Sequence, residues 1–150
     1  MLHRFGVFVA GITACYKYIQ RIKSAEMTEL GLKGTHVMCL YYLHQNSQGL
    51  TAAQLCQLCG EDKAAMSRSL SELEAGGFLQ THLTEGKKYR AKILLTPAGV
   101  EAAGKMDALI QNWVAAGGDG LTEQERESFY ATLERIAENL RSEYKHKESL

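Results

Sequence analysis

Two short, closely spaced helices constrain how this 150-residue chain can fold more than any other feature of its sequence. Thr51-Ala-Ala-Gln54 is a capping-box pattern, in which the threonine side chain accepts from an early backbone N–H and the glutamine reaches back. The helix that it opens is expected to stop at Gly60. Asp62 can cap the next helix, and Gly76-Gly77 terminates it. The sequence therefore predicts two short helices joined by a tight turn.

A change of hydrophobic period follows these helices. The stretches 78–83 and 89–95 alternate with a period of two, and they flank the segment Thr84-Glu-Gly-Lys-Lys88. This pattern predicts a β-hairpin with a basic tip.

Longer helices are predicted on both sides of this central part. Before it, helices are expected over about 2–23 and 33–45, joined by a polar, glycine-punctuated connection. After it, Thr96 and Pro97 are an N-cap and a first helical residue, and the helix that they start is broken at 115–118. A second capping box, Thr122-x-x-Glu125, opens the last helix.

The composition fits a globular chain that is mainly helical. Apolar residues make up 45% of it, which is enough to bury a core, and Pro97 is its only proline. The net charge of zero conceals an asymmetry, because residues 1–92 carry 11 Lys or Arg against 7 Asp or Glu, and residues 93–150 carry 6 against 10. A nucleic-acid-binding surface is therefore expected in the first part.

The order of these elements is that of a winged helix-turn-helix lobe between terminal helices. The stretch 51–80 resembles the MarR (multiple antibiotic resistance regulator) family, and Leu95-Thr96-x-x-Gly99 matches that family's Leu-Thr-x-x-Gly after the hairpin. Within the stretch the resemblance is carried by Asp62, Lys63, Ser67, Arg68, Leu73, Glu74 and Gly77. It implies one domain over 1–150, mainly α with a small β-hairpin wing, with the lobe at about 32–96 and dimerisation helices at about 2–23 and 97–147.

The resemblance also implies a function and partners. It predicts a cytoplasmic, homodimeric transcription regulator that binds double-stranded DNA at a palindromic operator and acts as a ligand-responsive repressor without a cofactor. Wings of this family usually carry Asp-x-Arg at the tip, where this sequence has Lys87 and Tyr89. That ion pair cannot form here, although Lys87, Lys88 and Arg90 still offer cations to phosphates.

The second short helix has the two faces that a DNA-reading helix needs. On a helical wheel Met66, Leu70 and Leu73 fall on one side, and small or short polar side chains fall on the other with one arginine. Short side chains permit close approach to base edges, and an arginine offers paired donors to guanine or to phosphate. The predicted DNA-binding residues are Lys63, Ala64, Ser67, Arg68 and Ser71, with Lys87, Lys88 and Arg90 in the hairpin.

The terminal helices are predicted to form the dimer. They carry many apolar residues, among them Phe5, Val9, Trp113, Phe129 and Leu133, of which some must belong to the monomer core instead. Family members commonly bind small, often aromatic or phenolic, ligands between the dimer helices and the DNA-binding lobe. By element, the candidate lining residues are Tyr16, His36, Tyr41 and Trp113, although core packing is the simpler explanation for each.

Cysteines and histidines leave two sensor hypotheses open. Cys56-x-x-Cys59 invites a redox role, but the pair is expected late in a short helix, where buried and unreactive thiols are favoured. His36, Cys39 and His44 could form a zinc site, since His36 and Cys39 are one turn apart, but no fourth ligand is evident. Reduced thiols fit the cytosol.

Other classes of protein are less well supported. The sequence has no nucleophile–base pattern, phosphate-binding glycine loop or paired acids for hydrolysis, so an enzyme is not expected. A winged-helix module that binds only protein is disfavoured by the basic hairpin tip. The start of the chain looks like a lipoprotein signal ending at Cys15, but the apolar stripe continues through that point to Ile19, which favours an amphipathic helix.

Overall fold

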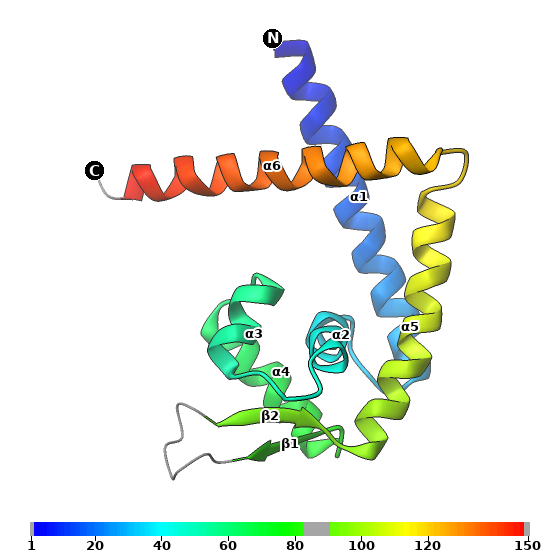
Figure 1. Cartoon of the computed structure of the whole chain (residues 1–150), viewed down its shortest axis with the longest axis vertical. Helices are drawn as coiled ribbons and strands as arrows, with labels where there is room; N and C mark the ends of the chain where they lie inside the picture. The colour runs from blue at the N-terminus through cyan, green and yellow to red at the C-terminus, as the bar shows by residue number, and fades with distance from the viewer. Residues whose placement is uncertain (1, 83–90, 149–150) are drawn as a thin grey trace. The chain divides into compact units, whose positions relative to one another are not determined.

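Figure 1 shows the computed structural model, which describes residues 2–82 and 91–148. The chain forms two compact units, one up to Ile110 and one from Gln111. No helix in the described part combines the length and apolar character that a membrane span requires.

The first unit contains the winged helix-turn-helix lobe. In chain order its elements are α1 (Leu2–Glu29), the 3-10 turn η1 (Gly34–His36), α2 (Val37–Gln45), α3 (Ala52–Cys59), α4 (Lys63–Ala75), β1 (Leu79–His82), β2 (Lys92–Leu95) and the start of α5 (Pro97–Gly117). The strands pair antiparallel, with Leu79 opposite Leu95. The predicted fold class, mainly α with one small β-hairpin, is confirmed. The predicted hairpin tip lies outside the described residues.

The two short helices begin and end where the sequence predicts. The Thr51 side chain accepts from the Gln54 backbone N–H, and the Gln54 side-chain oxygen accepts from the Thr51 N–H at 2.9 Å. Gly60 ends α3 in the left-handed conformation, with φ of 69°. Asp62 then caps α4 by accepting from the Ala65 N–H at 2.7 Å. These boundaries follow from local side-chain chemistry alone.

The first helix is longer than predicted. The expected connection over 24–34 instead continues α1 to Glu29, because the polar stretch before that residue contains no glycine or proline. The turn after the helix contains Gly31, whose N–H donates to Thr28 O, and the Leu32 N–H donates to Met27 O. This is a Schellman motif, and it places the fully buried Met27 in the core. The predicted helix over 33–45 correspondingly begins with the turn η1.

The core of the first unit lies among the lobe helices and the hairpin (Figure 1). Helix α3 contacts α2 and α4, and the hairpin contacts α2 through β2 and α4 through β1. The fully buried large side chains are Met27, Val37, Cys39, Leu40, Leu55, Leu73 and Met106. They come from α1, α2, α3, α4 and α5, so the lobe and its flanking helices share one core.

The second unit comprises the end of α5 and the helix α6 (Glu123–Glu148). Thr122 and Glu125 form the predicted capping box, with the Thr122 N–H donating to the Glu125 carboxylate at 2.8 Å. The Arg126 guanidinium donates to Gly118 O at 2.9 Å and closes the turn between the helices.

Candidate nucleic-acid interface

Helix α4 has the inner and outer faces that its sequence predicts. Met66 and Leu73 are buried, and Leu70 is half-buried against the same side. The residues of this helix that were predicted to meet DNA are all exposed, namely Lys63, Ala64, Ser67, Arg68 and Ser71. The helix therefore presents one cation among short side chains, with another cation, Lys63, at its first residue.

Arg68 is available to a ligand. None of the ion pairs among the described residues includes it, and its side chain is exposed. A guanidinium has five N–H donors in a planar fork, which matches guanine edges and phosphates. The arrangement can thus supply a bidentate donor from a surface that lets a large partner approach closely.

The cations of the hairpin divide into two groups. Lys87, Lys88 and Arg90, which were predicted to contact phosphates, lie outside the described residues. Lys92 on β2 is half-buried, and its ammonium donates to Gly49 O at 3.2 Å. This lysine therefore ties the hairpin to the loop before α3.

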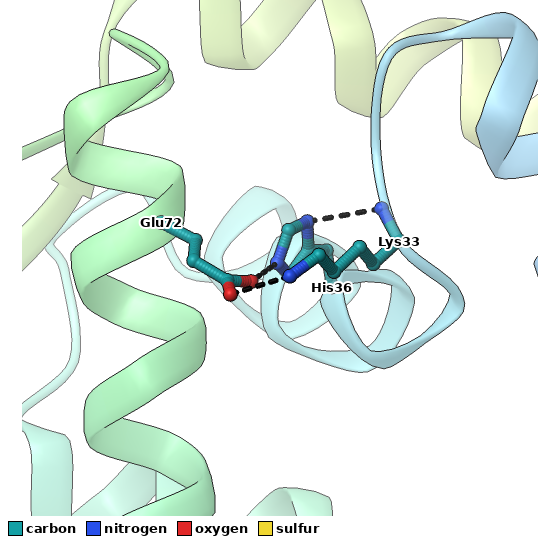
Figure 2. A network of polar contacts seen from close by, with 3 residues as sticks. All are labelled: Lys33, His36 and Glu72. Carbon is teal, nitrogen blue, oxygen red and sulfur yellow. Dashed lines mark hydrogen bonds and ion pairs between the residues drawn. The ribbon is translucent and has the colours of Figure 1, made fainter.

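A polar network beside α4 has no counterpart in the sequence prediction (Figure 2). The Glu72 carboxylate of α4 accepts from the Lys33 ammonium through one oxygen, and its other oxygen lies 2.9 Å from His36 Nε2. His36 Nδ1 accepts from the Lys33 backbone N–H at 3.2 Å. No local pattern points to this contact, because Glu72 lies 36 residues after His36.

The four predicted ligand-lining residues are distributed over both units and differ in exposure. Tyr16 is exposed on α1, and Trp113 belongs to the second unit. Tyr41 is half-buried and packs edge-on against Tyr42, with ring centroids 5.2 Å apart. His36 is buried, with both ring nitrogens in the Glu72 network.

A hollow of about 230 Å³ opens elsewhere, between α3, α4 and the hairpin. Its lining residues are Ala52, Ala53, Leu70, Glu74, Leu79, Thr81, Ala91 and Ile93. None of the four predicted ligand residues is among them.

The histidines proposed as zinc ligands have other partners. His36 contacts Glu72, and His44 Nδ1 lies 2.9 Å from Asp107 Oδ2 of α5. Cys39, which lies between the two histidines in the sequence, is buried. Over residues 2–82 and 91–148 no three side chains of the metal-binding types converge on one point.

The cysteines differ from the predicted burial. Cys56 and Cys59, expected to be buried, are both half-buried, whereas Cys39 is fully buried. The two cysteines lie on the last turn of α3. Leu55 is the buried residue of this helix, so only the side of α3 that carries Leu55 faces the core. Burial raises the pKa of Cys39 to about 12 and that of Cys59 to about 11. Thiols with such pKa values are weak nucleophiles near neutral pH.

Iodoacetamide at pH 7 is expected to leave Cys39 and Cys59 unmodified in the folded protein. The thiolate is the reactive form, and a pKa of about 11 leaves a fraction on the order of 10⁻⁴ at this pH. Peptide mass spectrometry measures the labelling, and all four cysteines should react in urea, which is the control. Rapid labelling of Cys59 in the native state, with a change in DNA binding, would identify a thiol sensor instead.

Comparison with known proteins gives a consistent result. A family model described as "MarR family" matches residues 30–88. A MarR-family transcriptional regulator from Silicibacter pomeroyi is 25% identical, with 85% of this chain and 86% of that chain covered and a TM-score of 0.75. One from Listeria monocytogenes, complexed with a 26mer DNA, is 20% identical with coverage of 94% and 93% and a TM-score of 0.85. The MepR–DNA complex of S. aureus is 18% identical, with coverage of 86% and 93% and a TM-score of 0.78.

Proposed function

We propose that this chain, which a MarR family model matches over residues 30–88, is a transcription regulator of that family that binds double-stranded DNA sequence-specifically in the cytoplasm. The observation that carries the proposal is the exposed face of α4, where Arg68 stands among short side chains and forms no ion pair with any other described residue. Two similar structures, from Listeria monocytogenes and S. aureus, are complexes with DNA. A helix of this kind fits the major groove of duplex DNA.

Selection from a random duplex pool tests this function. The full chain should enrich a palindromic sequence with half-sites about one helical turn apart, because a two-fold dimer presents two copies of α4. An electrophoretic shift with the enriched duplex and a scrambled one then measures specificity. Absence of any enriched sequence, together with equal affinity for both duplexes, would contradict sequence-specific binding.

A homodimer is part of the proposal. Helix α1 exposes a stripe of large apolar side chains, including Phe5, Val9, Ile12, Tyr16 and Ile19. In the second unit α6 exposes Phe129, Tyr130, Leu140 and Tyr144. Soluble monomers rarely expose so much apolar surface, so we propose that a second copy covers these helices.

Sedimentation at micromolar concentration is expected to show a dimer. Phe5→Asp with Ile12→Asp should produce monomer, since it places two charges in the apolar stripe of α1. Ala14→Asp is the matched control, because position 14 lies on the opposite side of the same helix, and it should remain dimeric. A parent protein that sediments only as monomer would refute the dimer.

A ligand-responsive repressor is the narrower form of the proposal. It rests on the family resemblance and on aromatic residues such as Tyr16 and Tyr41 in the first unit. Release of the selected duplex by small phenolic compounds would support it.

A further inference from the structure

Glu72 and Arg68 stand four residues apart on α4, the spacing at which opposite charges on a helix meet. Such a pair would draw the guanidinium onto its own helix. Instead both Glu72 oxygens contact Lys33 and His36, as Figure 2 shows, and Arg68 has no ion pair within the described ranges. Glu72 therefore contacts a segment distant in sequence and not the arginine on its own helix.

Hydrogen bonds at both ring nitrogens fix the orientation of His36. Its Nδ1 accepts from the Lys33 backbone N–H, which assigns the ring proton to Nε2 as the donor to Glu72. The His36 side chain is only 6% exposed, whereas that of Glu72 is 41% exposed. A buried ring therefore fixes where an exposed carboxylate points.

The same contact compensates the charge of Glu72. The Lys33 ammonium, and after it the His36 ring, hold the pKa of the Glu72 carboxyl below its ordinary value, so the group stays ionised beside a positive partner. Without that partner, a carboxylate one turn from Arg68 would repel an approaching phosphate.

We infer that Lys33 and His36 are positioning residues for Arg68: by holding Glu72, they keep the guanidinium free for DNA. The inference rests on the proposed function, because it takes the outer face of α4 as the DNA-binding surface. Neither Lys33 nor His36 needs to contact DNA for this role.

The test removes the donors and the acceptor separately. Lys33→Met deletes the ammonium and keeps the aliphatic stem, His36→Leu deletes the ring donor, and Glu72→Gln deletes the charge that they hold. With the duplex selected from the random pool as the probe, the Lys33→Met/His36→Leu protein should bind roughly three- to tenfold more weakly, since both half-sites gain a competing carboxylate. Adding Glu72→Gln should restore binding to within about twofold of the parent.

A second readout needs no DNA. Solvent exchange of the Arg68 Nε–H, followed by NMR, should slow when Glu72 is released and should recover with Glu72→Gln. Lys105→Met is the control, because Lys105 forms another exposed pair with a glutamate, Glu101, on α5. It should change neither DNA affinity nor Arg68 exchange.

Two results would overturn the inference: unchanged binding by Lys33→Met/His36→Leu, or a loss that Glu72→Gln does not restore, which indicates a structural role only. Should the buried His36→Leu change prevent folding, Lys33→Met alone removes one of the two donors, at a side chain that is 64% exposed. A smaller loss of binding that Glu72→Gln restores is then expected, and a loss that it does not restore overturns the inference. A parent that binds no duplex would overturn the proposed function, and the exchange measurement would then still show whether Lys33 and His36 keep Glu72 from Arg68.

Discussion

Arg68→Ala is expected to lower the affinity for the selected duplex by about 1–3 kcal/mol and to relax the base preference at one position of each half-site. The reason is geometric. Arg68 is exposed among Ala64, Ser67 and Ser71, so its planar fork can reach a base edge without a longer neighbour in the way. Titrations on cognate and scrambled duplexes at several salt concentrations measure both effects.

The lysines of the hairpin tip should behave differently. Lys87→Ala with Lys88→Ala is expected to weaken cognate and scrambled binding together, because the sequence predicts that these ammonium groups contact phosphates rather than bases. The dependence of log affinity on log salt should flatten by roughly one unit for each lost phosphate contact.

Lys105→Ala is the charge control for both variants. It removes one exposed cation from α5 and should leave specificity unchanged. If Arg68→Ala bound both duplexes as the parent does, α4 would not be the recognition helix.

Gly99→Ala is expected to destabilise the fold by about 3 kcal/mol. A Cβ at Gly99 would lie 2.1 Å from Phe78 O, a backbone atom that cannot move aside as a flexible side chain could. The Thr96 hydroxyl links the two segments that approach each other here, because it donates to Gly77 O at 2.6 Å and accepts from the Gly99 N–H. Urea unfolding followed by circular dichroism measures the loss.

Gly104→Ala is the matched control on the same helix. A Cβ there meets nothing within 4 Å, so alanine should stabilise α5 by about 0.5–1 kcal/mol through its higher helix propensity. Equal stability of the two alanine variants would show that the contact between Gly99 and Phe78 does not constrain the fold.

Local chemistry in the sequence determined most of the secondary structure. The caps at Thr51, Asp62 and Thr122 lie where the sequence places them, because a capping side chain bonds backbone within three residues of itself. Periodicity likewise determined the two faces of α4, including the exposure of Arg68. Gly99 was recognised as part of a motif, but only the structure shows that Phe78 O requires a glycine there.

Contacts between segments distant in sequence were decided by the tertiary structure. The stretch before Glu29 contains no glycine or proline and therefore permits a helix, and only the structure shows that α1 continues through it and buries Met27 in the core. The four-residue spacing of Arg68 and Glu72 permits an ion pair between them on α4, because side chains at positions i and i+4 are neighbours on a helix. In the folded protein Glu72 instead contacts Lys33 and His36, which lie more than 30 residues earlier in the chain. Packing of η1 against α4 brings these two donors to the Glu72 carboxylate. Helical spacing determines which pairs a helix can form, and the packing of other segments against it selects the pairs that form.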